Sequence, residues 1–532
     1  MTGTADAEGD ADDRRRAEGT AGDADPAGAG AGARAGADGT TVRTVTRSTK
    51  SETKPVDPTD DLVTTAHTLK IGRSTLRYHA STGRIVLREE IYTDGTFEGR
   101  QAKAEVAITT YTRDGADAHT RPVTFAFNGG PGSSSVWLHM GLFGPRRVVM
   151  GDAGELHAPP YALADNPESL LAVSDLVLID PVSTGWSRAA EGAKPGAYHG
   201  FRKDVESVAE VIRLWVGRNG RWMSPKFVAG ESYGTTRAAA LAEHLQSEMG
   251  MYLNGLLLIS SVLDFGSGDF DAPRNDRAHA LYLPHYAAAA HYHGKHGRRS
   301  LKAVLKEAEE YAADRYPWAL ARGNRLTAAE RADAVSTVAG LAGLSADYVE
   351  RADLRIEHWR FYTELLRDQR LSIGRIDARF TGPAASAIAE HMDADPSIDA
   401  ISGPYTAAFQ HYVRSELEYE SDLHFQAITA RVYPWSYKEF EGRPVYVVDK
   451  LERAMRQNPH LKVHFSYGYY DGATPYFAAE DVVAHLNLPD HLVANIEHAH
   501  YEAGHMMYVH EPSRLQQCRD LAAFVTASVP PR

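Results

Sequence analysis

Short apolar runs and longer amphipathic segments alternate along most of this chain. The apolar runs are rich in Val, Ile, Leu and Phe and are bounded by turn residues, which predicts buried strands. The segments between them carry apolar residues at the spacing of one helix face. Strands that alternate with helices predict an α/β fold with a central, mostly parallel sheet. These strands are expected at 122–127, 175–180, 226–229, 255–260, 461–465 and 492–496.

Two regions break this alternation. Ahead of the first buried strand, β-branched and aromatic residues predict antiparallel strands at one sheet edge, at Ser74–His79, Gly83–Arg88 and Glu105–Tyr111. Later the strand pattern nearly disappears, and helical periodicity prevails at 300–316, 327–344 and 345–355. We interpret this second block as a helical insertion that caps the functional site. The expected domains are a low-complexity tail over 1–60, a first core part over 61–265, the cap over 266–440 and a second core part over 441–532.

Composition limits the class of protein. The net charge is -13 and no Lys/Arg stripe stands out, so we expect no nucleic-acid partner. No apolar run approaches the roughly 18 residues of a membrane span, so we expect no membrane partner. The tail lacks the apolar segment of an export signal, and its composition predicts disorder. With Cys518 as the one cysteine, no intramolecular disulfide can form, and a cytoplasmic protein is expected.

The sequence Gly230-Glu-Ser-Tyr-Gly234 is the strongest chemical signal in the chain. It follows the predicted strand at 226–229 and precedes an Ala/Leu-rich segment that predicts a helix. A G-x-S-x-G sequence between a strand and a helix is typical of a nucleophile elbow, in which the serine stands on a strained turn. The glycines allow the strand and the helix to approach that turn closely. Ser232 is therefore the candidate nucleophile.

A nucleophilic serine needs a base, and the base needs a carboxylate that orients it. In the fold that such an elbow implies, the chain order is serine, acid, histidine. Asp471 lies just past the predicted strand at 461–465, and His505 follows the strand at 492–496, so both stand where strand-end loops can present them. Asp481 is a weaker candidate for the acid, because it lies in a predicted helix.

Four histidines near the C-terminus raise a metal site as an alternative. His498, His500, His505 and His510 cluster in the sequence, but their spacing matches no standard ligand pattern and no cysteine is near. We expect neither a metal nor another cofactor.

A second glycine-rich sequence, Asn128-Gly-Gly-Pro-Gly-Ser-Ser-Ser135, ends the predicted strand at 122–127. Successive glycines let backbone N–H groups point into a cavity without obstruction by side chains. One oxyanion donor in such hydrolases comes from an early strand-end loop, and the other is the residue after the nucleophile. This assigns the N–H groups of Gly130 and Tyr233, although the loop could also be a tight turn without a catalytic role.

Together these residues resemble the serine carboxypeptidase family, which has the α/β-hydrolase fold. The resemblance spans roughly residues 75–265 and 440–520, and Asn166–Ser169 and Leu178–Ser187 are similar to linking segments of that family. The low cysteine content indicates a bacterial-type member. The insertion and the tail match the family only in being present.

The resemblance implies a role for each matching residue. Ser232 is the nucleophile, His505 the general base and then acid, and Asp471 its orienting carboxylate. Asn128, the Gly129 N–H and Glu231 bind the free α-carboxylate of a peptide. A glutamate can donate a hydrogen bond to a carboxylate only when it is protonated, and the family accordingly tends to work at acidic pH.

Two positions depart from the family. Many members pair the glutamate with a second one, where this chain has Leu142, so a strongly acidic optimum is not expected. Secretory and vacuolar relatives often have a cysteine where Ser133 stands, and its absence is consistent with a reducing compartment.

Three function classes remain open. The first is a serine carboxypeptidase acting on peptides with a free C-terminus, and the presence of both Asn128 and Glu231 favours it. The second is an acyltransferase or esterase that uses the same triad on a small-molecule acyl substrate. The third is a non-enzymatic binding protein, which would be expected to have lost a triad residue. The sequence leaves the oligomeric state open.

Overall fold

The computed structural model describes residues 57–530, so most of the tail predicted over 1–60 lies outside the described residues. A ten-stranded sheet with the order β1-β2-β3-β7-β4-β9-β10-β13-β14 forms the centre, and β8 pairs with β3. Its strands are β1 (Asp61–Ile71), β2 (Ser74–Thr93), β3 (Thr96–Arg113), β4 (Val123–Phe127), β7 (Asp175–Ile179), β8 (Arg188–Ala189), β9 (Lys226–Glu231), β10 (Gly255–Ile259), β13 (Lys462–Gly468) and β14 (Ile496–Tyr501).

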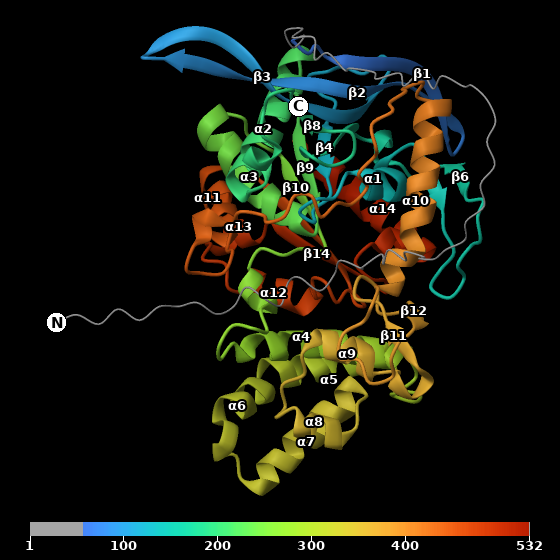
Figure 1. The fold of residues 1–532 in the computed structure, drawn as a ribbon, viewed down its shortest axis with the longest axis vertical. Helices are drawn as coiled ribbons and strands as arrows, with labels where there is room; N and C mark the ends of the chain where they lie inside the picture. The colour runs from blue at the N-terminus through green and yellow to red at the C-terminus, as the bar shows by residue number, and fades with distance from the viewer. Residues whose placement is uncertain (1–56, 531–532) are drawn as a thin grey trace, which may run out of the picture. The chain divides into compact units, whose positions relative to one another are not determined.

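Helices cover both faces of this sheet (Figure 1). One face carries α2, α3 and α11, and the other carries α1, α10 and α14. The helices are α1 (Val136–Leu138), α2 (Phe201–Arg218), α3 (Tyr233–Met249), α4 (Asp276–Tyr292), α5 (Leu301–Ala313), α6 (Arg315–Arg322), α7 (Ala328–Ala342), α8 (Ala346–Arg351), α9 (His358–Glu364), α10 (Pro396–Ser415), α11 (Val448–Gln457), α12 (Tyr476–Ala484), α13 (Asp490–Val493) and α14 (Glu511–Ala527).

Six neighbouring strands of the sheet are all parallel to one another, in the order β7, β4, β9, β10, β13 and β14. Strand β9 therefore lies between β4 and β10. Alternate residues of β4 belong to two separate apolar clusters: Phe125 and Phe127 to one, and Ala126 to the other. Because successive strand residues point to opposite faces, these clusters are the two sides of the sheet. The predicted α/β-hydrolase fold, with a mostly parallel central sheet, is confirmed.

The antiparallel edge differs from the prediction in one respect. The strands expected at 74–79 and 83–88 are a single long strand, β2, which runs through Gly83. A Cβ atom on Gly83 would lie 1.9 Å from the carbonyl oxygen of Asp61 in β1. This glycine therefore serves close strand pairing at a φ of +145° rather than a turn.

The prediction of a strand at 492–496 is wrong. Residues Asp490–Val493 form the short helix α13, which buries Leu492, and the strand β14 begins only at Ile496 and pairs with β13. A short apolar run does not distinguish a buried helical turn from a strand, and Pro489 ahead of it favours a helix start.

The predicted insertion lies between β10 and β13, which are adjacent and parallel in the sheet. Helices α4 to α9 gather at one end of the sheet in Figure 1, together with the small hairpin of β11 (Leu371–Ile373) and β12 (Thr381–Pro383). The segment predicted as one helix at 300–316 is divided into α5 and α6 at Asp314. This arrangement supports our proposal that residues 266–440 form a cap, although α10 packs against the hairpin of β5 (Arg146–Val149) and β6 (Ala162–Asp165). In the part of the chain that the structure describes, no helix is both long and apolar enough to cross a membrane.

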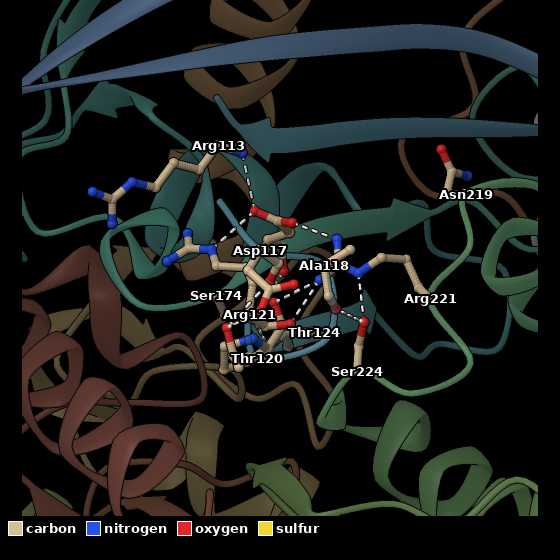
Figure 2. A network of polar contacts seen from close by, with 12 residues as sticks. Arg113, Asp117, Ala118, Thr120, Arg121, Thr124, Ser174, Asn219, Arg221 and Ser224 are labelled. Carbon is tan, nitrogen blue, oxygen red and sulfur yellow. Dashed lines mark hydrogen bonds and ion pairs between the residues drawn. The ribbon is translucent and has the colours of Figure 1, made fainter. Parts of the chain in front are cut away.

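A buried ionic network joins the amino ends of the central strands (Figure 2). The Asp175 carboxylate at the start of β7 accepts hydrogen bonds from Arg121 Nε at 3.1 Å and from Arg221 Nη1 at 2.6 Å. It also accepts the backbone N–H of Arg113 at the end of β3. Arg221 in turn binds the carbonyl oxygen of Arg121. One carboxylate thus joins the start of β7 to the end of β3 and to the loops that precede β4 and β9.

Replacing Asp175 with alanine is expected to lower the free energy of unfolding by about 3–5 kcal/mol, because two buried arginines lose their counter-charge. Urea unfolding followed by circular dichroism measures this loss. The matched control is Asp347→Ala, which breaks the exposed pair with Arg351 and should cost less than about 0.5 kcal/mol. Equal losses in the two variants would contradict the structural role given to Asp175.

Candidate active site

Ser232 stands at the tight turn between β9 and α3. Its backbone has φ 61° and ψ −131°, a region that L-residues rarely occupy, and its N–H donates to the carbonyl oxygen of Ile259 at the end of β10. A Cβ atom on Gly230 would lie 2.1 Å from the oxygen of Gly234. The motif therefore needs glycine at that position, and the turn has the strain expected of a nucleophile elbow.

The glycine-rich loop after β4 lies directly against this turn. A Cβ atom on Gly129 would come within 2.5 Å of the amide nitrogens of both Tyr233 and Gly234. Among the described residues, the N–H groups of Gly130 and Tyr233 have no hydrogen-bond acceptor. Both residues line the same cavity as Ser232. The two N–H groups are thus available to an oxyanion formed at Ser232.

His505 and Asp471 form a buried pair. His505 Nδ1 lies 2.8 Å from Asp471 Oδ2, and Thr474 Oγ1 donates to the same oxygen at 2.7 Å. The N–H groups of Ala473 and Thr474 donate to the other oxygen, Asp471 Oδ1. With Nδ1 facing a carboxylate, the imidazole carries its proton there and leaves Nε2 free to act as a base.

A segment of the insertion joins the loops that carry this pair. The carbonyl oxygen of Ile376 accepts the N–H of His505 at 2.7 Å, and the carbonyl oxygen of Arg375 accepts the N–H of Gly472 at 3.0 Å. The Asp377 carboxylate accepts the N–H of Gly504. Sequence analysis missed this segment, because a pattern of polar and apolar residues does not reveal contacts between residues that stand almost 100 or more positions apart.

The charges of this pair follow from its surroundings. Burial alone would raise the pKa of Asp471, but His505 and the hydrogen bonds from Thr474 hold it below its usual value. Burial likewise opposes protonation of His505, yet the charges of Asp471 and Glu231 raise its pKa above the usual value. Asp471 is therefore ionised, and His505 is a stronger base than an exposed histidine.

The competing candidates lie elsewhere. Asp481 in α12 pairs with Arg277 and not with His505. His500 Nε2 contacts Glu480, and His498 Nδ1 contacts the hydroxyl of Tyr467. Among residues 57–530, no group of three or more His, Cys, Asp or Glu side chains is placed to hold a metal ion.

Glu231 is buried beside the nucleophile and has two polar partners. Asn128 Nδ2 donates to Glu231 Oε1 at 2.7 Å, and the hydroxyl of Tyr508 donates to Oε2 at 2.7 Å. Burial raises the pKa of Glu231 to about 7, an effect that His505 and the two hydrogen bonds offset only in part. Near neutral pH this carboxyl therefore holds a proton in a large share of the molecules.

Sequence analysis did not identify the aromatic wall around Glu231. Tyr508, three residues after His505, and Tyr405 in α10 belong to the apolar cluster that also contains Leu142. Leu142 is 1% exposed and brings no carboxyl to this wall. The hydroxyl of Tyr405 is buried without a hydrogen-bond partner. A tyrosine three residues after a histidine is a common feature of sequences, so Tyr508 gave no signal that would have predicted its contact with Glu231.

Comparisons with known proteins bear on the family. A family model described as serine carboxypeptidase matches residues 109–519. No curated protein matches the chain. Among solved structures, it is similar to proline iminopeptidase from Mycobacterium smegmatis, at 12% identity and a TM-score of 0.34, with 87% of this chain and 98% of that chain covered.

Two further structures show similarity of the same degree. One is a peroxisomal alpha-beta-hydrolase from Saccharomyces cerevisiae, at 10% identity and a TM-score of 0.33, with 89% of this chain and 92% of that chain covered. The other is an N-acyl homoserine lactone degrading enzyme, at 12% identity and a TM-score of 0.35, with 82% of this chain and 100% of that chain covered.

The raised pKa of Glu231 predicts a pH-dependent stability. The folded state holds the proton up to about pH 7, whereas an unfolded glutamate loses it near 4.5, so stability falls as pH rises between these values. Glu231→Gln lacks this titration. Between pH 5 and pH 8 the unfolding free energy of the wild type should fall by about 2 kcal/mol relative to the variant.

Urea unfolding of both proteins at the two pH values measures this difference. Exposed Glu502 has no such environment, so Glu502→Gln should show the pH dependence of the wild type. The prediction is contradicted if the stability of Glu231→Gln changes with pH as that of the wild type does. Glu231 would then be ionised in the folded protein over the whole range from pH 5 to pH 8.

Proposed function

Because the chain belongs to the serine carboxypeptidase family, and is therefore a serine hydrolase, we propose that it removes the C-terminal residue from peptides. Ser232 is the nucleophile, His505 the base and Asp471 its orienting carboxylate. The substrates are peptides with a free C-terminus. The one cysteine, buried Cys518, supports the further proposal that the enzyme works in a reducing compartment such as the cytoplasm.

In the proposed reaction, His505 Nε2 takes the proton of Ser232 Oγ as that oxygen attacks the scissile carbonyl carbon. The N–H groups of Gly130 and Tyr233 bind the carbonyl oxygen as it becomes negative. His505 then gives its proton to the leaving nitrogen, the C–N bond breaks, and an acyl-enzyme remains. A water molecule that loses its proton to His505 hydrolyses this ester and restores Ser232.

The observation that carries the peptide proposal is the buried Glu231 carboxyl next to Ser232. When protonated it can donate a hydrogen bond to a substrate carboxylate, and a pKa of about 7 makes that form available at neutral pH. Asn128 and the Gly129 N–H belong to the loop after β4, which packs against the turn that holds Ser232, and the unpaired hydroxyl of Tyr405 offers a further donor. A cluster of hydrogen-bond donors one residue from the nucleophile suits the α-carboxylate of a terminal residue.

The second candidate is an acyltransferase or esterase with a small-molecule acyl substrate. The observation that favours it is Leu142, which leaves the carboxylate-binding set with one acidic residue. The triad chemistry is the same in both cases, and only the recognition of a terminal carboxylate separates them.

Three substrates distinguish these functions: an N-blocked dipeptide, its C-terminally amidated copy, and a simple acyl ester. We expect cleavage of the free-acid dipeptide and of the ester but not of the amide, because the amide cannot occupy the carboxylate site as an anion. Ser232→Ala should lower kcat by roughly five to six orders of magnitude. Release of the C-terminal amino acid measures the reaction.

The matched control is Ser247→Ala, which changes an exposed serine of α3, the helix that begins directly after Ser232. It should leave the rates unchanged. Turnover of the ester with neither peptide cleaved would refute the carboxypeptidase and favour the second candidate.

The two substrate types should also differ in their pH dependence. His505 must be neutral in both reactions, so both rates rise with pH. Only the dipeptide requires protonated Glu231, so its kcat/KM should fall again as pH rises through about 7, whereas ester hydrolysis should reach a plateau.

In Glu231→Gln the amide donates at every pH, and the falling limb should disappear for the dipeptide. Glu502→Gln should retain it. A falling limb that persists in Glu231→Gln would assign that ionisation to another group.

A further inference from the structure

A cavity of about 230 Å³ opens beside Ser232. One water molecule occupies roughly 30 Å³ in the liquid, so this volume admits a side chain of several heavy atoms. The cavity is built from both parts of the chain. The core lines it with Gly130, Ser232 and Tyr233, and the insertion adds Tyr282, His358 and Arg375.

This cavity and the Glu231 carboxyl border different apolar clusters. Tyr233 and Tyr282, which line the cavity, belong to one cluster, whereas Tyr508, which binds Glu231, belongs to the other. In the proposed function the Glu231 side holds the terminal residue that leaves. The cavity then remains for the residue on the acyl side of the scissile bond, so this inference rests on the proposed function.

Arg375 is the unusual residue of the cavity. Its guanidinium lies over the ring of Trp359, 5.5 Å from the centroid, and its Nε is buried without a hydrogen-bond partner. Among the described residues it has no ion-pair partner, whereas the buried guanidinium groups of Arg237 and Arg379 are paired with Asp204 and Asp377. A buried N–H without an acceptor costs free energy, which a ligand that accepts a hydrogen bond from it would recover.

The carboxyl groups around Arg375 are all engaged with other partners. Asp471 binds His505 and Thr474. Asp395 accepts three backbone N–H groups, including that of Arg375 itself. Glu357 caps α9 through two backbone N–H groups, and its oxygen lies 2.8 Å from His358 Nδ1. Among the described residues, none of these carboxylates makes an ion pair or a hydrogen bond with the Arg375 guanidinium.

A second group in the cavity also lacks a partner. Ser261, which follows β10, is 3% exposed, and its hydroxyl has no hydrogen-bond partner. Ser261 and Arg375 line the same small cavity, and both are donors. A carboxylate accepts hydrogen bonds from a hydroxyl and from a guanidinium at once, which a neutral aliphatic group does not.

We propose that this cavity binds an acidic side chain, and that Arg375, with Ser261, makes the enzyme select peptides with glutamate or aspartate immediately before the C-terminal residue. The selectivity arises from differential binding in the transition state of acylation, when the side chain is held in the cavity. Arg375 is thus a specificity-determining residue, and it takes no part in proton transfer.

The test uses N-blocked dipeptides that differ only in the first residue, Glu, Gln or Lys, and simple esters of the same three blocked residues. The wild type should hydrolyse the Glu compounds with a kcat/KM roughly 10- to 100-fold above that of their Gln isosteres, since a charge-assisted hydrogen bond is lost with Gln. In Arg375→Gln the Glu:Gln ratio should fall to about one, and Arg375→Lys should restore part of it. Arg375→Glu should reverse the preference toward Lys, a gain that a misfolded protein cannot produce.

Arg351→Gln, an exposed arginine of the same insertion, should retain the wild-type ratio. The inference is overturned if the wild type does not distinguish Glu from Gln, or if its preference survives in Arg375→Gln. It is also overturned if Arg375→Gln weakens every free-acid dipeptide equally, because the guanidinium would then bind the α-carboxylate. Failure of the proposed function has a different signature, in which no dipeptide is cleaved and the ratio is measured on the esters.

Discussion

The loop after β4 and the turn after β9 approach each other so closely that a side chain on the loop would collide with the turn. A Cβ atom on Gly129 would lie 2.5 Å from the amide nitrogens of Tyr233 and Gly234. Arg237, 1% exposed, holds this contact by donating to the carbonyl oxygen of Asn128 at 2.8 Å. The proposed nucleophile, both proposed oxyanion donors and the proposed carboxylate-binding residues all belong to these two segments. A change in their separation would therefore displace the proposed nucleophile relative to the proposed oxyanion donor on the neighbouring loop.

The proposed base, His505, depends on a different constraint, which the insertion supplies. Arg375 and Ile376 accept backbone hydrogen bonds from Gly472 and His505, and so hold together the two loops that present Asp471 and the imidazole. The same segment presents the Arg375 side chain to the cavity beside Ser232. In the proposed function the insertion acts on catalysis through its backbone, and in the further inference it acts on substrate selection through the side chain of Arg375. Variation in that side chain can change specificity while the backbone contacts keep the base in place.

The sequence predicted the parallel sheet and candidate positions for the active-site residues, because both depend on local patterns. Buried strands bounded by turn residues, and glycines at a strand-to-helix turn, are visible in a few consecutive residues. The errors arose where tertiary contacts determine the local structure. Gly83 lies in a continuous strand packed closely against β1 rather than in a turn, and Leu492 is buried in a helical turn rather than in a strand. The partners of Glu231 and the unpaired Nε of Arg375 depend on how segments distant in the sequence pack together. A local sequence pattern does not predict them.

Asp471 and Glu231 show how two buried carboxyls near one imidazole come to differ in charge. Asp471 accepts hydrogen bonds from two backbone N–H groups, from Thr474 and from His505, so its pKa is lowered despite burial. Glu231 has two neutral donors, which do not offset burial, and its pKa is raised. In the proposed function the active form, with protonated Glu231 and neutral His505, has the same number of protons as the inactive ion pair. The balance between these two forms cannot be shifted by pH. It is set by how strongly burial disfavours the Glu231 anion and how strongly Asp471 favours the imidazolium. Leu142 is buried in the same apolar cluster as Tyr508, the partner of Glu231, and supplies no second carboxyl that could share the proton.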